Sequence, residues 1–307
     1  MSTKNYGMEL RQLRYFVSVA KALNFSEAAR TLCITQSTLS QQIKQLEQEL
    51  EVELFERNSH NVSLTENGWR LLPLAEKTLQ DAKSCKEQMR DLKNMISGEL
   101  IIGATYSFCP ILTETLRNFL KEYPGVKLRI CSHSMEELLD MLKKRELDIV
   151  LSFKPTSLSE YIESHTLFVD SLSVILRRDH PLSSRRSLSL DDLRHQSVVL
   201  PAKGLQARST LERIVDIARS DWDVRVELNE VNMLLDVVES SEMITFLSNA
   251  TIFHRPALKA ISLDVPQNRV EGCVHILKKS YRKRSAEVFL KMLSESNEVN
   301  AKQNKWE

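Results

Sequence analysis

The chain has 307 residues, which is too long for one average domain and predicts two or three folded units. Its hydrophobic fraction of 42% and charged fraction of 27% are ordinary for a soluble globular protein, and no run approaches the roughly 20 apolar residues of a membrane span. The net charge of +1 provides no whole-chain argument for nucleic-acid binding, so such an argument must rest on local shape. The N-terminal segment lacks the apolar core of a secretory signal, and we therefore predict a cytoplasmic protein.

The first elements in the chain are three predicted helices. An apolar stripe at helical spacing runs from Leu13 to Leu23 and indicates the first helix. Between Asn24 and Leu50 we predict two short helices with a tight turn between them. Ser26 is the expected N-cap of the second helix, and Thr35 is the expected N-cap of the third. The apolar face of the third helix consists of Leu39, Ile43, Leu46 and Leu50.

The opposite face of that third helix is polar, and packing does not require it. Its short hydroxyl and amide side chains suit the base edges of the DNA major groove, which is wide enough for one helix. After it, residues 51–65 predict a hairpin wing in which Arg57 and His60 are candidates for phosphate or minor-groove contact. The polar face of the helix carries Gln36, Ser37, Ser40, Gln41 and Lys44.

A long helix follows Thr65 and ends before Gly98. Its apolar residues alternate four and three apart, which is typical of a two-stranded coiled coil and predicts self-association. The alternative is a helix that packs on its own domain. The residues of this heptad seam are Leu71, Ala75, Thr78, Ala82, Cys85, Met89, Leu92 and Ile96.

From Glu99 the pattern changes to alternating strands and helices, which predicts an α/β fold with a parallel sheet. Ser134 and Glu137 form a capping-box pattern at the start of one helix. Further alternation from Phe168 predicts a second α/β lobe, and residues 294–307 are predicted to be a polar tail. The predicted strands are 99–104, 126–131, 147–153, 168–177, 198–200, 224–228, 243–247 and 270–277, and the predicted helices are 111–122, 135–145, 204–219, 231–240 and 285–293.

The N-terminal residues resemble the LysR-type transcriptional regulators. The segments LRQLRYFVSVAKALNFSEAARTL, TQSTLSQQIKQLEQEL, LFER and LTENG follow that family's winged helix-turn-helix in order and spacing, and the resemblance continues more weakly to about residue 292. It implies an α/β multidomain protein with a winged helix-turn-helix, a long linker helix and a two-lobed effector domain like a periplasmic binding protein. The implied divisions are a DNA-binding domain at 8–66, a linker and dimerisation helix at 67–97, an effector-binding domain at 98–293 (lobe I about 98–168 and 268–293, lobe II about 169–267) and a tail at 294–307.

In that family the start of the third helix and the wing contact DNA, so the resemblance adds Thr35 and Asn61 to the predicted DNA-binding residues. Members of the family often have Pro in place of Ser37 and Arg in place of Gln41. Between Met8 and Glu66 the chain has six basic and eight acidic residues. Because phosphate neutralisation dominates non-specific affinity, we expect one copy of this domain to bind DNA weakly and pairing to restore the affinity.

The resemblance also implies an effector site between the lobes. Several of the corresponding loops precede helices, whose N-termini favour an anion, although Ser107 and Ser134 could simply cap their helices. The implied effector-binding residues are Thr105, Tyr106, Ser107, Ser132, His133, Ser134, Pro201, Ala202, Lys203 and Asn232.

We therefore predict a sequence-specific, effector-controlled transcriptional regulator whose partners are a double-stranded DNA operator, a small-molecule effector and other copies of itself in a homodimer or homotetramer. RNA polymerase is a further candidate partner. One alternative is a thiol or redox sensor that uses Cys109 and Cys131, and an enzyme is a weaker one. The basic run from Lys278 to Arg284 is either a second DNA-binding patch or a solvated connection.

Overall fold

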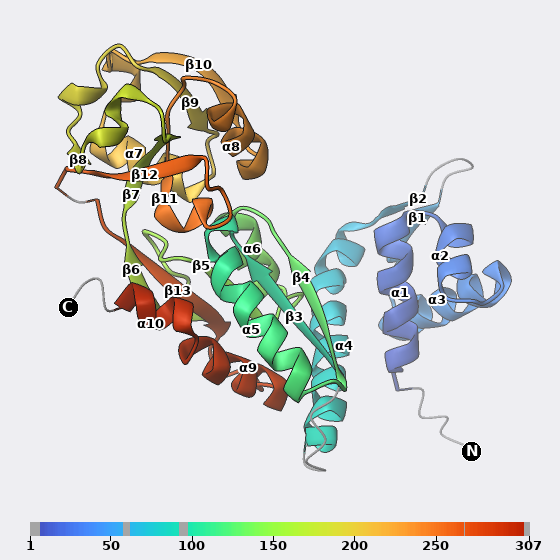
Figure 1. Cartoon of the computed structure of the whole chain (residues 1–307). Helices are drawn as coiled ribbons and strands as arrows, with labels where there is room; N and C mark the ends of the chain where they lie inside the picture. Colours follow the sequence, from blue (N-terminus) through green and yellow to red (C-terminus); the bar gives the residue numbers. More distant parts are fainter. Residues whose placement is uncertain (1–6, 58–61, 92–97, 267, 304–307) are drawn as a thin grey trace, which may run out of the picture. The chain divides into compact units, whose positions relative to one another are not determined.

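The computed structural model describes residues 7–57, 62–91, 98–266 and 268–303 (Figure 1). It divides into two compact units, one up to Lys93 and one from Asn94 onward. Each unit has its own hydrophobic core. The two units are therefore described separately.

The first unit is a bundle of helices with a small hairpin. Phe55 at the start of the hairpin packs against Phe16 and Phe25, with ring centroids 5.5 Å and 5.6 Å apart. Strands β1 and β2 pair antiparallel, with Phe55 opposite Leu64. The elements are α1 (Leu10–Ala22), α2 (Phe25–Thr31), α3 (Gln36–Leu50), β1 (Phe55–Arg57), β2 (Val62–Leu64) and α4 (Glu66–Asp91).

The start of α2 differs from the prediction. Its N-cap is Asn24, whose side-chain oxygen accepts a hydrogen bond from Glu27 N at 3.0 Å, so Ser26 lies inside the helix. Asn is as good an N-cap as Ser, so the residue types alone did not decide between them. The preceding helix ends at Ala22, and its C-cap Leu23, with a left-handed backbone (φ 46°), turns the chain toward Asn24.

The long helix α4 begins at a cap formed by Thr65. The Thr65 hydroxyl accepts a hydrogen bond from Gly68 N and donates one to Glu53 O. Leu71 and Ala75, the first two residues of the predicted seam, pack into the core of their own unit. Cys85 and Met89 are exposed, and Leu92 and Ile96 lie outside the described residues. The alternative of packing within the domain therefore accounts for the start of the seam, and self-association remains a prediction for its second half.

The second unit begins with a lobe built on a five-stranded sheet of order β4-β3-β5-β13-β6. Strands β4, β3 and β5 are parallel as predicted, whereas β13 pairs antiparallel with both β5 and β6. Phe108, Phe119 and Phe289 are fully buried in its core. The elements of this lobe I are β3 (Gly98–Ala104), η1 (Tyr106–Phe108), α5 (Cys109–Glu122), β4 (Val126–Cys131), α6 (Met135–Lys143), β5 (Ile149–Phe153), β6 (Ile162–Asp170), β13 (Val270–Leu277), α9 (Arg284–Ser294) and α10 (Asn297–Gln303).

Lobe II contains a four-stranded sheet of order β11-β7-β12-β8 and a parallel pair, β10-β9. The predicted strand 168–177 is in fact two strands, because β6 ends in lobe I and β7 begins in lobe II. Strands β8 and β12 were not predicted, and the predicted helix 204–219 is shorter. The elements are β7 (Leu172–Arg177), η2 (Pro181–Ser184), β8 (Ser187–Leu188), η3 (Asp191–Leu193), β9 (Ser197–Pro201), α7 (Gln206–Ile214), η4 (Ile217–Arg219), β10 (Asp223–Leu228), α8 (Val231–Glu239), β11 (Thr245–Ser248), η5 (Asn249–Ile252) and β12 (Leu258–Leu263).

Two chain segments cross between the lobes, and the buried Asn268 joins them. The Asn268 side chain accepts a hydrogen bond from Leu172 N at 2.8 Å. Its amide nitrogen donates to Leu172 O at 2.8 Å and to Leu263 O at 3.0 Å. The ends of β7 and β12 nearest lobe I are therefore tied together by one side chain.

The tail predicted over 294–307 is wrong for residues 297–303, and residues 304–307 lie outside the described residues. Residues 297–303 form α10, which packs on lobe I with Val299 fully buried. The carboxylate of Glu114 on α5 accepts hydrogen bonds from Asn297 N and Glu298 N, and Gln303 Nε2 donates to Leu167 O. Because these partners are distant in sequence, the polar composition of the segment gave no sign of them and predicted a tail instead.

Candidate functional site

The N-terminal half of α3 presents a polar surface. Leu39, Ile43 and Leu46 bury the other side of the helix. The Thr35 side chain caps the helix, as predicted, by accepting a hydrogen bond from Thr38 N at 3.2 Å. The predicted contact residues Thr35, Gln36, Ser37, Gln41 and Lys44 are exposed, and Ser40 is half-buried.

Hydrogen bonds within this surface hold its polar side chains in place. Gln36 Nε2 donates to Ser40 Oγ at 3.1 Å, one helical turn away. The hydroxyl of Thr35 lies 3.0 Å from that of Ser37 and 2.7 Å from that of Thr38. The bond to Ser40 orients the Gln36 amide, and the residue as a whole is exposed. Such an ordered amide can contact a base edge with little loss of side-chain freedom.

The predicted wing is the β1–β2 hairpin. Arg57 lies opposite Val62 in the last pair of the ladder before the tip of the hairpin. The predicted tip residues His60 and Asn61 lie outside the described residues, as does the side chain of Arg57. Their contact with DNA therefore stays a prediction.

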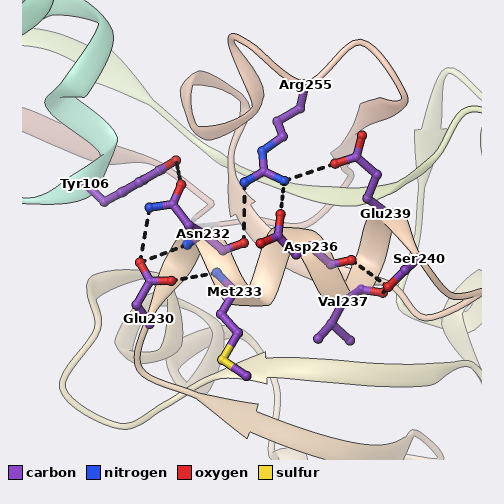
Figure 2. Close-up of polar contacts among 9 residues, drawn as sticks. All are labelled: Tyr106, Glu230, Asn232, Met233, Asp236, Val237, Glu239, Ser240 and Arg255. Carbon is purple, nitrogen blue, oxygen red and sulfur yellow. Dashed lines mark hydrogen bonds and ion pairs between the residues drawn. The ribbon is translucent and has the colours of Figure 1, made fainter.

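The two lobes of the second unit meet at a hydrogen bond between two predicted effector residues. Tyr106 Oη, in η1 of lobe I, donates to Asn232 Oδ1, in α8 of lobe II, at 2.7 Å (Figure 2). Burial raises the pKa of the Tyr106 phenol, and the nearby Cys109 thiol adds to this effect. The phenol therefore remains protonated at neutral pH and can act as the donor.

Glu230 and Arg255 hold Asn232 in position (Figure 2). Glu230 accepts hydrogen bonds from Asn232 N at 3.1 Å, from Asn232 Nδ2 at 3.2 Å and from Met233 N at 2.6 Å. The backbone N–H of Met233 is the main cause that lowers the pKa of Glu230, so this carboxylate is ionised. Arg255 contacts Asn232 O at 3.5 Å and pairs with Asp236 and with Glu239.

The helix N-termini around the lobes differ in whether a side chain already occupies them. The N–H groups that begin α8 bond to Glu230, and those of α6 bond to Ser134 within a capping box with Glu137. The N-termini of η1 and α7 have no side-chain cap. The Thr105 hydroxyl beside η1 is buried without a hydrogen-bond partner within the described residues. An anion would therefore find unused donors at η1 and α7 rather than at α6 or α8.

The other predicted effector residues follow strands of the two lobes. Ser132 and His133 are exposed after β4, and Ser107 is half-buried in η1. Pro201 is buried at the end of β9, while Lys203 is exposed. Ala202 N donates to Leu228 O at 2.7 Å, which joins the loops that follow β9 and β10. Ligand contact by these residues stays a prediction.

A cavity of about 960 Å³ lies beside the segments that cross between the lobes. It is lined by parts of both lobes, including Asp170, Ser173, Phe253, Arg255 and Glu298. None of the predicted effector residues lines it. This cavity is therefore separate from the predicted effector site, and only Arg255 belongs to both the cavity lining and the network around Asn232.

The two cysteines of the redox alternative lie in surroundings that disfavour their thiolate forms. Cys109, at the start of α5, is exposed, and Cys131, at the end of β4, is half-buried. Desolvation by the surrounding protein raises the pKa of both thiols. Because the thiolate is the reactive form, raised pKa values reduce reactivity at neutral pH.

Sequence reasoning missed three residues of these sites. Thr38 bonds to Thr35 and could have been recognised as a further polar residue on the exposed side of α3. Glu230 directly precedes a helix, which is a recognisable N-cap position. Arg255 lies in a connection between elements, and no sequence pattern pairs it with acidic residues on α8.

A winged helix-turn-helix followed by two α/β lobes that meet at a polar contact defines a class of protein: DNA-binding regulators with an effector domain. Residues 10–69 match the family model described as "Bacterial regulatory helix-turn-helix protein, lysR family", and residues 93–298 match "LysR substrate binding domain". The second match alone covers more than half of the chain. The chain belongs to the LysR family of DNA-binding transcriptional regulators.

Curated relatives and solved structures are consistent with this family. The regulator AlsR of Bacillus subtilis is 30% identical over 86% of each chain, and CfxR of Cupriavidus necator is 33% identical over 69% of this chain and 67% of its own. A full-length variant of OxyR from Pseudomonas aeruginosa is 25% identical, with a TM-score of 0.74 over 97% of this chain and 98% of its own. CbnR in complex with its target DNA has the same fold, at 21% identity and a TM-score of 0.66 over 94% and 99% of the two chains.

Within the described residues, no helix combines the length and the apolar character that crossing a membrane requires. No group of three or more His, Cys, Asp or Glu side chains in the same residues is arranged to hold a metal ion.

Proposed function

We propose that the N-terminal half of α3 reads the operator and that a small anionic effector binds where the two lobes meet. The DNA-contacting set comprises the exposed α3 residues together with Arg57, His60 and Asn61. Bound effector would contact both lobes and so favour one arrangement of the lobes over another. A ligand can shift such an equilibrium only by binding one state more tightly than the other.

The observation that supports the effector proposal is the hydrogen bond between Tyr106 of lobe I and Asn232 of lobe II. The hydrogen bond to Asn232 is exposed at the junction of the lobes, and a ligand there can replace it. The Thr105 hydroxyl, which has no hydrogen-bond partner among the residues that the structure describes, and the start of η1, which has no side-chain cap, provide donors next to it. Lys203, exposed in the loop between β9 and α7, adds a positive charge. This set of groups fits a carboxylate or phosphate.

The effector site can be tested with a thermal-shift panel of small carboxylates and phosphates on the full-length chain. A true ligand raises the melting temperature, and at one hundred times its Kd it stabilises the fold by about 2.7 kcal/mol. We expect this shift to be largely lost in Thr105→Val, which removes a hydroxyl with no hydrogen-bond partner among the described residues but keeps the shape of the side chain, and in Tyr106→Phe. Tyr123→Phe, which loses only a bond to Glu122, is the control. Equal shifts in all variants, or no shift in the unmodified chain, would contradict the proposal.

The reading face can be tested with Gln36→Ala and Ser40→Ala. Operator fragments are first selected from genomic DNA with the unmodified chain, and the affinities for selected and scrambled duplexes are then compared. Each good bidentate base contact contributes about 1–3 kcal/mol of discrimination, so losing the Gln36 contact should cut specificity roughly fivefold or more. Gln45→Ala, on an exposed residue outside the predicted contact set, is the control. Undiminished specificity in both test variants would refute the assignment.

The remaining parts of the proposal concern partners and setting. We propose that the chain acts in the cytoplasm as a homodimer or homotetramer and that RNA polymerase is a further partner. We assign it no enzymatic activity, because regulation by DNA binding accounts for the sites described. The redox alternative is not favoured, because desolvation raises the pKa of the Cys109 and Cys131 thiols.

A further inference from the structure

Two basic loops lie at the end of lobe I where β3 and β5 begin. The first covers residues 143–146, from the last residue of α6 onward, and the second covers residues 278–284, from the end of β13 to the first residue of α9. Together they contain eight basic residues and one acidic residue. This concentration of charge contrasts with the net charge of +1 for the whole chain.

The sheet brings these two loops together although about 130 residues separate them. Strand β13 runs antiparallel to β5 with His275 opposite Val150, so the end of β13 lies beside the start of β5. Lys283 Nζ then donates to Asp148 Oδ2 and to Glu99 O, both at 2.8 Å. The second loop is therefore anchored to the first residues of β3 and to the residue just before β5.

Some of the positive charges at this end are neutralised within the protein, and others are not. Lys144 pairs with Asp140, and Arg284 pairs with Glu287. Lys278, Lys279 and Arg282 are exposed and form no ion pair with any residue that the structure describes. These three cations, which we call the basic pole, are free to attract a partner from solution.

We propose that the basic pole contacts the phosphate backbone of the duplex DNA that the helix-turn-helix unit binds. The pole has the charge for a polyanion, and duplex DNA is the polyanion that this family of regulators binds. The DNA-binding domain itself, with six basic and eight acidic residues from Met8 to Glu66, is poor in the charge that phosphate contact needs. The connection from that domain joins lobe I at Gly98, at the same end as the pole.

The test compares the salt dependence of DNA binding in full-length variants. A fluorescent duplex of mixed sequence is titrated with the unmodified chain and with the triple variant Lys278→Gln, Lys279→Gln, Arg282→Gln at several KCl concentrations. Each phosphate neutralised contributes a slope of about 0.9 to the plot of log affinity against log salt. We expect the slope to fall by roughly 2 to 3 per bound copy in the triple variant.

The control is the triple variant Arg186→Gln, Arg219→Gln, Arg225→Gln, which removes the same charge from exposed positions in lobe II. We expect its slope to match that of the unmodified chain. Equal loss of slope in both triple variants would mean a general charge effect and would overturn the proposal. An unchanged slope in the pole variant would also overturn the proposal. Binding of the same variant to poly-glutamate would then be measured, and a loss of that binding would indicate an acidic protein as the partner instead.

A variant that retains the charge distinguishes loss of charge from loss of folded structure as the cause of a changed salt dependence. Lys278→Arg, Lys279→Arg, Arg282→Lys keeps all three cations and should keep the slope of the unmodified chain, since phosphate neutralisation depends on charge. Loss of slope in this variant would contradict the proposal. Because the three side chains are exposed, both pole variants should keep the melting temperature of the unmodified chain.

Discussion

His275 is a buried histidine in the middle of the lobe I sheet. Its Nδ1 lies 2.6 Å from Ser164 Oγ, and its Nε2 is buried with no hydrogen-bond partner in the described residues. Desolvation lowers the pKa of His275 to about 4. The folded protein therefore holds this ring neutral, whereas the unfolded chain protonates it near pH 6.5.

This difference predicts a loss of stability in acid. Above pH 6.5 the His275 ring is neutral in both states, and no proton opposes folding. As the pH falls from 6.5 toward 4, the unfolded state gains a proton that the folded state does not, which destabilises the fold by up to about 3 kcal/mol. Urea unfolding of the full chain at pH 7, 5.5 and 4 measures this effect. His275→Gln should show a smaller decrease over this range than the exposed control His133→Gln, and equal decreases would contradict the prediction.

Single residues were predictable from sequence where their role is local. The caps formed by Thr35 and Ser134 each depend on atoms within three residues, and both were predicted correctly. The bond between Tyr106 and Asn232 spans 126 residues and depends on the fold. The resemblance to the family placed both residues near the effector, but it did not indicate that they bond to each other.

Gly68 shows how closely the helix α4 approaches the segment before the wing. A Cβ atom at Gly68 would lie 2.2 Å from Leu54 O and 2.8 Å from Leu64 Cδ2. The first of these is a backbone atom, which can move only if the segment between α3 and β1 moves. The absence of a side chain at Gly68 therefore allows the helix and the hairpin to pack together.

We expect Gly68→Ala to destabilise the first unit by about 1–3 kcal/mol, the usual cost of overpacking, even though Ala favours helix more than Gly does. Thermal and urea unfolding of the full chain would measure the change. The matched control is Gly7→Ala, where a Cβ atom meets nothing within 4 Å. If the Gly68→Ala protein were as stable as that control, the segment between α3 and β1 would be able to move away from the added Cβ atom without loss of stability, and the prediction would be wrong.

Elements were predicted well where their own residues carry the apolar pattern. Strand β13 and the end of α5 agree with the predicted bounds, because alternating or helical apolar residues fill them. Helix α10 was missed because Val299 is the one strongly apolar residue in its sequence NEVNAKQ. Its stability depends on the distant Glu114 carboxylate and on packing against lobe I.

At the scale of the whole molecule, the exposed second half of α4 predicts self-association. Ala82 and Met89 lie on the predicted seam, and Met89 is 58% exposed. We expect Ala82→Asp, Met89→Asp to weaken association at least tenfold, or about 1.4 kcal/mol, because two charges would have to be desolvated in an apolar contact. Sedimentation velocity measures the change. Gln80→Asp, Gln88→Asp adds the same charge off the seam, and comparable dissociation of both variants would argue against the seam.

The hydrogen bonds of the Asn268 side chain affect which motions between the lobes have a low free-energy cost. Two of its hydrogen bonds join the two crossing segments through Leu172, so a motion that separates these segments has to break both bonds in a buried setting. We expect bending of the chain on either side of Asn268 to leave these bonds in place. We therefore expect the lobes to move by hinge bending about the crossing segments. A bound effector would then act by changing one quantity, the angle between the two lobes.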